Sequence, residues 1–288
     1  MRRWKLVLVS AALLSMLVSL VGPTAIGAQE PLVLSIHPYL SSTEIYKRFT
    51  PLAVHLGKEL GRPVEIRVNS SYESHVETVG AGQVDLAFMG PAAYVKLIDG
   101  YGKFPLLAAF ETTSGRTFTG VIFVKKGSPI KTIAQLRGKA FAFGPAPSTM
   151  SNLVPRYMLL KAGLDLHNLG SVEFLTNHEN IVLGVLSGRY DVGAIKDDIF
   201  KEYEARGLTT LAVSDPMPDH IFVARPSLPG ETVSKISMVM LSLKSTEEGR
   251  RILASIQKNL VALVPVKNSD YDPLRKVLES LAKAGVKP

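Results

Sequence analysis

The fold is decided by residues 141–152, which read FAFGPAPSTMSN. Residues 141–143 form an apolar run typical of a buried strand, and a glycine and two prolines then turn the chain. The hydroxyl-rich residues 148–151 open an expected helix that runs to Ala162, just before a glycine. A strand that leads through a tight turn into a helix is the repeating unit of α/β proteins.

The same alternation continues on both sides of this stretch. Short runs rich in Val, Ile and Phe predict strands over residues 32–36, 64–68, 86–89, 106–110, 121–124, 140–143, 172–174, 192–195, 210–213 and 220–224. Apolar residues at helical spacing predict helices over residues 43–60, 72–81, 92–98, 151–162, 179–186, 233–243 and 247–260. Strands that alternate with helices indicate mostly parallel α/β sheets with helices on both faces.

Two stretches suggest that the chain is divided into two lobes. Residues 119–127 end a first series of strands and helices, and residues 219–226 end a second series. We therefore expect a first lobe of residues 29–122 with 222–288 and a second lobe of residues 123–221. The last helices are expected to return to the first lobe without strands of their own. The chain then crosses twice between the lobes, and a cleft between them suits hinge closure around a ligand.

The N-terminus predicts export. Residues 1–28 have a basic start, a short apolar core and a small-residue exit, which together form a secretory signal peptide cleaved after Gly27 or Ala28. The alternative is an uncleaved membrane anchor, but the apolar run is shorter than the ~20 residues that span a bilayer. The chain has no cysteine, so neither a thiol-linked lipid nor a disulfide can form. We expect a soluble protein secreted to the periplasm.

Charge and motifs argue against several partners. The net charge is +8, and removing residues 1–28 leaves 30 basic residues against 25 acidic ones. These are spread along the chain, without the Lys/Arg-rich block that binds nucleic acid. The sequence contains no His-Glu-x-x-His, no paired cysteine ligands and no P-loop. We therefore expect no nucleic-acid partner, no metal and no cofactor.

The helix start at residues 148–151 is the best candidate for a binding site. A helix N-terminus has unpaired N–H groups and the positive end of the helix dipole, and so it binds anions. The hydroxyls of Ser148, Thr149 and Ser151 add donors without formal charge. The alternative is an ordinary N-cap after a strand–helix loop, because serine and threonine are common caps. Taken by itself, the segment fits this second interpretation better.

Four segments, in the same order, resemble the periplasmic phosphate/phosphite/phosphonate-binding proteins of ABC importers. Residues 147–151, PSTMS, resemble the Ser-Thr-Ser-Gly helix start of that family. Residues 88–95, FMGPAAYV, are similar to its strand–Gly–Pro–x–x–Tyr segment, and residues 177–194 to its histidine and Gly-x-x-Asp-x-Gly-Ala strand. Residues 49–61 match its early helix. The resemblance covers nearly the whole mature chain and implies an α/β, type II periplasmic binding protein with two lobes.

This resemblance implies that the protein is the solute-binding component of an ABC importer. A small oxyanion such as phosphonate, phosphite or phosphate is expected to bind between the lobes, and the closed monomer to dock on a membrane permease. No catalytic residue is implied. The implied ligand-binding residues are Tyr46, Tyr94, Ser148, Thr149, Met150, Ser151, His178, Asp197 and Asp198.

Several of these residues also have a plainer interpretation. An isolated histidine such as His178 is more often structural, and Tyr94 could belong to the core. Asp197 and Asp198 could be solvated loop acids, because beside an anion a carboxylate helps only by accepting from a protonated oxygen or an amino group of the ligand. Met150 replaces the family's serine, which leaves the choice of oxyanion open.

Two other functions are compatible with parts of the sequence. Ser148, His178 and Asp198 have the residue types of a nucleophilic triad, which would make the protein a hydrolase. A triad is established by geometry, however, and the sequence has no Gly-x-Ser-x-Gly elbow. The second alternative is a ligand-sensing protein that presents a different small anion to a membrane sensor.

Overall fold

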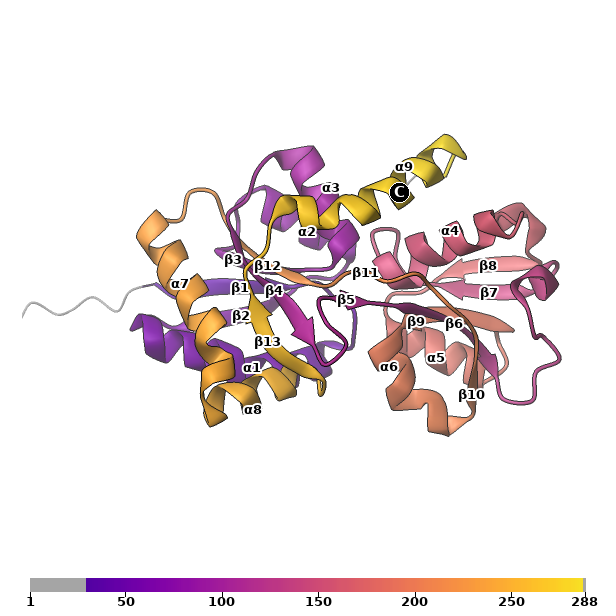
Figure 1. Cartoon of the computed structure of the whole chain (residues 1–288), viewed down its shortest axis with the longest axis horizontal. Coiled ribbons are helices and arrows are strands. Elements are labelled where there is room, and N and C mark those ends of the chain that lie inside the picture. The colour runs from indigo at the N-terminus through magenta and orange to yellow at the C-terminus, as the bar shows by residue number, and fades with distance from the viewer. Residues whose placement is uncertain (1–29, 287–288) are drawn as a thin grey trace, which may run out of the picture.

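The computed structural model describes residues 30–286, which form two α/β lobes joined by a narrow ribbon (Figure 1). The expected export signal, residues 1–28, lies outside the described residues. Between residues 30 and 286, no helix combines the length and the apolar character needed to cross a bilayer.

The first lobe is built on a six-stranded sheet that is covered on both faces. β1 pairs in parallel with β2 and β3, whereas β12 and β13 run antiparallel to their neighbours. Helices α1, α7 and α8 share one apolar cluster, and α2, α3 and α9 share another. In spatial order the strands are β13 (Leu260–Val264), β4 (Leu106–Thr112), β12 (Ile221–Ala224), β3 (Leu86–Met89), β1 (Leu32–Ile36) and β2 (Val64–Val68). The helices are α1 (Ser42–Leu60), α2 (Tyr72–Gly80), α3 (Pro91–Tyr101), α7 (Gly230–Ser242), α8 (Glu247–Ile256) and α9 (Asp272–Lys283).

The second lobe is built on a five-stranded sheet. β7 pairs in parallel with β8 and β9, and β6 runs antiparallel to β9 and β10. The strands, in spatial order, are β10 (Leu208–Val213), β6 (Gly120–Lys125), β9 (Val192–Lys196), β7 (Ala140–Phe143) and β8 (Ser171–Phe174). The helices are α4 (Val154–Lys161), α5 (His178–Leu186) and α6 (Asp197–Tyr203).

The chain crosses between the lobes in an antiparallel ribbon of two short strands. These are β5 (Thr117–Phe118) and β11 (Met217–Pro218), which lie side by side between the two sheets (Figure 1). The expected boundaries at residues 122/123 and 221/222 fall inside β6 and β12, a few residues after each crossing. The division of the chain into two lobes at those positions stays a prediction.

Local sequence signals explain where many elements begin and end. β7 spans the expected residues 140–143, and α1 ends where Gly61 adopts a left-handed conformation, with φ of 66°. Helices α2, α5 and α8 begin after Ser71, Asn177 and Thr246, whose side chains accept backbone N–H groups of the first turn.

The C-terminal region differs from the expectation. The helix predicted over residues 247–260 ends at Ile256, and Leu260–Val264 forms β13 at the edge of the first sheet. The prediction that this region brings no strand of its own is therefore wrong. The reason is that a short, buried apolar run fits a strand and a core helix equally well by periodicity. Helices α6 and α9 were also not predicted.

Direct contacts hold the two lobes against each other. The backbone N–H of Ser41 in the first lobe donates to Glu179 Oε2 in the second, over 2.9 Å. Arg48 donates from Nη2 to both carboxylate oxygens of Glu202, each over 3.1 Å. The C-terminal helix α9 contacts α3 of the first lobe and α4 of the second. Residues that lie between the lobes are therefore enclosed by protein on both sides.

Candidate functional site

A cluster of polar side chains is buried where the lobes meet. It draws on the ends of β1 and β9, the starts of α2 and α5, the loop after β7 and the segment after β11. Polar groups at the ends of strands and the starts of helices are the usual ligand-binding positions in open α/β sheets. We call this set the interlobe cluster, and its members are His37, Tyr39, Tyr72, Ser148, Ser151, His178, Lys196, Asp198, Asp219 and His220.

One end of the interlobe cluster consists of hydroxyl groups, and we call Tyr72, Ser148 and Ser151 the hydroxyl end. The Oγ atoms of Ser148 and Ser151 are 2.5 Å apart, and the Tyr72 side chain is buried beside Ser148. Burial raises the pKa of Tyr72 well above its usual value, so its hydroxyl stays protonated. The hydroxyl end therefore offers donors without formal charge.

The loop after β7 positions these hydroxyls. Ser148 caps a single π-helical turn, Thr149–Leu153, which continues into α4, so the helix begins earlier and wider than expected. The N–H of Gly144 donates to the carbonyl of Ser151 over 2.7 Å. A Cβ on Gly144 would lie only 1.8 Å from Ser151 Oγ. Glycine is therefore required here by the close approach of the Ser151 side chain.

The side chains of Thr149 and Met150 point away from the hydroxyl end. Thr149 Oγ1 accepts the N–H of Ala92 over 3.0 Å and so ties this loop to the start of α3 in the first lobe. The Met150 side chain is buried in an apolar cluster and lies against Gly120, where an added Cβ would be 3.1 Å from the sulfur. Neither side chain reaches Tyr72 or the serines.

The other end of the interlobe cluster carries charge, and we call Lys196, Asp198 and Asp219 the charged end. Lys196 Nζ lies 3.5 Å from Asp198 Oδ2 and 3.9 Å from Asp219 Oδ1. It also donates to Gln257 Oε1 over 2.6 Å, across the lobes. Burial opposes the charge on Lys196, but the neighbouring carboxylates raise its pKa, so it stays an ammonium. Burial also raises the pKa of Asp198 and of Asp219, and Lys196 offsets this only in part.

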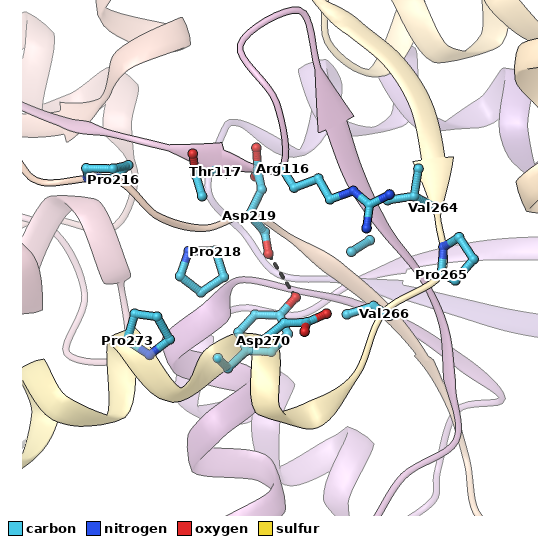
Figure 2. Close-up of a pocket in the computed structure, with 12 residues that line it drawn as sticks. Arg116, Thr117, Pro216, Pro218, Asp219, Val264, Pro265, Val266, Asp270 and Pro273 are labelled. Atoms are coloured by element: carbon cyan, nitrogen blue, oxygen red, sulfur yellow. Dashed lines mark hydrogen bonds between the residues drawn. The ribbon is translucent and has the colours of Figure 1, made fainter.

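A pocket of about 300 Å³ lies beside Asp219, on the side of the crossing ribbon (Figure 2). There the Tyr271 hydroxyl donates to the Asp219 carbonyl oxygen over 2.9 Å. The remaining walls are mostly apolar and include the prolines at 216, 218, 265 and 273 (Figure 2). The hydrogen bond from Tyr271 fixes the backbone of Asp219, so the Asp219 carboxylate is held toward Lys196 and His220.

Aromatic and imidazole rings connect the two ends. His37 stacks on His220, with ring centres 5.4 Å apart, and its edge meets Tyr72 at 5.0 Å. His37 donates from Nδ1 to the Phe88 carbonyl over 3.0 Å, and His220 donates from Nδ1 to Asp219 over 2.7 Å. Burial holds the pKa of both histidines well below the usual value, and Lys196 lowers that of His220 further. Both rings are therefore neutral near neutral pH.

His178 stands at the start of α5 and faces the same cluster. Its backbone N–H donates to the carbonyl of Tyr39 over 3.2 Å, which joins the lobes. Burial, together with repulsion from Lys196 and His220, lowers the pKa of His178 to about 3. Its Nδ1 atom is buried and has no hydrogen-bond partner within residues 30–286. The imidazole is thus a neutral group with one ring nitrogen available to a ligand.

The structure brings together four of the nine expected site residues: Ser148, Ser151, His178 and Asp198. Of the rest, Thr149 and Met150 lie on the same loop, as described above. Asp197 is adjacent to the cluster, but its carboxylate pairs with Lys201 at 3.3 Å.

The two expected tyrosines lie elsewhere. Tyr94 is buried between helices, where its hydroxyl donates to Asn268 Oδ1 over 2.9 Å and its ring packs on Tyr271. This placement matches the alternative of core packing. Tyr46 is 44% exposed on α1, and its hydroxyl donates to the Ile66 carbonyl over 3.2 Å. Neither tyrosine contacts the interlobe cluster.

Sequence reasoning missed six members of the cluster: His37, Tyr39, Tyr72, Lys196, Asp219 and His220. A signal for two of them exists in the sequence. His37 directly follows β1 and Lys196 is the last residue of β9, and ligands bind at the carboxyl ends of strands in α/β sheets. Within residues 30–286, no three or more His, Cys, Asp or Glu side chains are grouped so that they could hold a metal ion.

Comparisons of the sequence with known proteins agree on one family. Residues 34–271 match the family model described as ABC transporter, phosphonate, periplasmic substrate-binding protein. The phosphate-import protein PhnD of Mycolicibacterium smegmatis is 27% identical over 283 residues, which cover 89% of this chain and 87% of that relative.

Two solved structures share the fold. PhnD1 of Prochlorococcus marinus in complex with methylphosphonate has a TM-score of 0.80 at 20% identity, covering 88% of this chain and 99% of the other. A binding protein component of an ABC phosphonate transporter from Pseudomonas aeruginosa has a TM-score of 0.82 at 20% identity, covering 90% and 89%. The expected two-lobed, type II periplasmic binding-protein fold is confirmed.

Proposed function

The chain belongs to the family of periplasmic substrate-binding proteins of ABC phosphonate transporters, and we propose that it captures a small phosphorus oxyanion in the interlobe cluster. The ligand class is phosphonate, phosphite or phosphate. Residues 1–28 direct the chain to the periplasm and are then removed. The monomer closes around the ligand and delivers it to a membrane permease.

The observation that carries this proposal is the hydroxyl end. The hydroxyls of Ser148 and Ser151, at the start of a helix, lie within hydrogen-bond reach of each other, and Tyr72 is buried beside Ser148, so the three form a compact set of donors for the oxygens of one anion. Donors without charge suit an anion in a buried site, because they need no counter-charge when the ligand leaves. The buried Nδ1 atom of His178, also in the interlobe cluster and without a hydrogen-bond partner among the described residues, adds a fourth group.

The expected affinity follows from the number of contacts. Hydrogen bonds to a charged group contribute about 1.5–3 kcal/mol each, so four of them support micromolar or tighter binding. Closure strengthens each bond, because a buried site has a lower effective dielectric than water. Asp198 and Asp219 do not oppose this, since burial raises the pKa of each carboxyl and Lys196 stands beside both.

A hydrolytic function is not part of the proposal. The family is one of transport proteins. Ser148 is hydrogen-bonded to Ser151, whereas a triad needs its serine bonded to the histidine.

Calorimetry tests the ligand class. The purified protein is titrated with phosphate, phosphite, methylphosphonate, aminoethylphosphonate and sulfate. We expect binding of at least one phosphorus oxyanion and weaker binding of sulfate. If none of the phosphorus compounds binds, the ligand class is wrong.

A pair of variants tests the site. We expect Ser148→Ala combined with Ser151→Ala to weaken binding roughly 100-fold or more, because two hydrogen bonds to a charged ligand are lost. Ser242→Ala, which removes an exposed hydroxyl on α7, is the matched control and should bind normally. Unchanged affinity in the double variant would show that the ligand binds elsewhere.

A further inference from the structure

The ammonium group of Lys196 lies between the carboxylates of Asp198 and Asp219, where a cationic group of a ligand could bind if Lys196 were absent. Its side chain is only 4% exposed, and the side chains of Asp198 and Asp219 are 11% and 0% exposed. A pair of buried carboxylates is the usual recognition element for an ammonium group, because burying either charge without a partner is costly. In this chain that ammonium is supplied by the protein itself.

Lys196 is also held firmly in this place. Gln257 accepts its hydrogen bond over 2.6 Å from the opposite lobe. Its Nζ lies 5.3 Å from the ring centre of Phe118 and 6.0 Å from that of Phe110, within the range of cation–π attraction. A ligand amine would have to displace Lys196 from these partners or sit beside it, and two ammonium groups in one buried site repel each other.

A short run of rings connects the hydroxyl end with the charged end. The ring of His37 lies 5.0 Å from that of Tyr72 and 5.4 Å from that of His220, and His220 is bonded to Asp219. We place the carbon substituent of a phosphonate held at the hydroxyl end on the side of this run.

We propose that Lys196 is a specificity-determining residue that excludes phosphonates with an amino group. The inference rests on the proposed function and narrows it: the site accepts phosphate, phosphite and phosphonates with small uncharged substituents, and it discriminates against aminoalkyl phosphonates. The family resemblance alone does not make this distinction.

A matched pair of ligands tests the proposal. 2-Aminoethylphosphonate and n-propylphosphonate have nearly the same size and differ in the terminal group, which is ammonium in one and methyl in the other. We expect calorimetry to show that the protein binds the propyl compound at least roughly tenfold more tightly, since an ammonium group is lost from water without a partner. Equal affinities, or a preference for the amine, would overturn the proposal.

Variants locate the effect. Lys196→Met keeps the length of the side chain but frees both carboxylates, so the affinity ratio should shift by at least roughly tenfold toward the amine. Lys201→Met, on the helix that directly follows Lys196 but 63% exposed, is the control and should leave the ratio unchanged. An unchanged ratio in Lys196→Met, or an equal shift in both variants, would contradict a role for the Lys196 contacts.

Asp198→Asn provides a second arm that keeps Lys196 in place. It removes one carboxylate, so the ratio should move further against the amine, and a shift toward the amine would overturn the proposal. The outcomes also separate this inference from the proposed function. If methylphosphonate, phosphite and phosphate all fail to bind, the proposed function is wrong. If these ligands bind but the two compounds of the matched pair bind with equal affinity, only the inference about Lys196 is wrong.

Discussion

The two ends of the interlobe cluster present hydrogen-bonding groups in different ways. At the hydroxyl end, Ser148 and Ser151 are three residues apart in one loop, and the site is neutral. At the charged end, Lys196 and Asp219 come from segments far apart in the chain and carry opposite charges. Under the two proposals above, the difference teaches that binding and selection can be divided within one site: neutral donors hold the anion, and a fixed charge limits what is attached to it.

The largest expected effect comes from disturbing the hydroxyl end without removing a hydroxyl. In Gly144→Ala the added methyl group would overlap Ser151 Oγ, which lies 1.8 Å from the ideal Cβ position. We expect a loss of about 1–3 kcal/mol in the free energy of unfolding, as for other overpacked sites, together with a large loss of oxyanion affinity. Thermal denaturation and calorimetry measure the two effects.

Gly100→Ala is the control for this variant. Gly100 is an exposed helical glycine, and no atom lies within 4 Å of an added Cβ. Alanine should therefore be neutral or slightly stabilising there. If Gly144→Ala binds and melts like Gly100→Ala, the hydroxyl end is not the tightly constrained site described here.

A moderate effect is expected from pH, through the rings between the two ends. His37, His178 and His220 have pKa values below the usual 6.5 in the folded protein, because burial disfavours the imidazolium and Lys196 repels it at His178 and His220. Below about pH 6.5 the unfolded chain binds protons at these residues and the folded chain does not. Stability therefore falls as the pH falls, and removing a single one of these rings reduces the slope by up to about 1.4 kcal/mol per pH unit.

The carboxyls of the charged end have the opposite effect on stability as the pH falls. Burial raises the pKa of Asp198 and of Asp219 above 3.8, so as the pH falls toward that value the folded form takes up protons that the unfolded chain does not, which adds stability. The histidine effect is therefore isolated by comparing variants between about pH 6.5 and 4, because the carboxyl contribution is common to all of them. Melting temperatures measured over this range should fall less steeply in His178→Gln than in the unchanged protein. His167→Gln, at an exposed position, should not change the slope.

The smallest effect is expected at Tyr46, which belongs to neither end. Its hydroxyl contacts only the Ile66 carbonyl among the described residues, and the side chain is largely exposed. Tyr46→Phe should change the free energy of unfolding by no more than about 0.5 kcal/mol and leave oxyanion affinity unchanged. A clear loss of oxyanion affinity would show that Tyr46 takes part in binding, and the division of the site into two ends would be wrong.

The same comparison explains what could be predicted from the sequence. The two serines of the hydroxyl end were expected because they lie in one strand–turn–helix segment, and β7 was placed over the residues it occupies. At the charged end Asp198 was expected, but Lys196 and Asp219 were missed because they meet each other and Gln257 only once both sheets and the crossing ribbon are in place. Tyr94 was expected in the site from the resemblance alone, and its helix turns it toward α9 instead.

Contacts between the lobes bear on how the ligand leaves. The bonds from Ser41 to Glu179 and from Arg48 to Glu202 form within the protein, so they lower the free energy of the closed conformation independently of any ligand. A larger closed population raises the apparent affinity, because less of the binding energy is used to shift the conformational equilibrium. The same bonds oppose opening, so release becomes the step that a transporter must drive by supplying contacts that favour the open form.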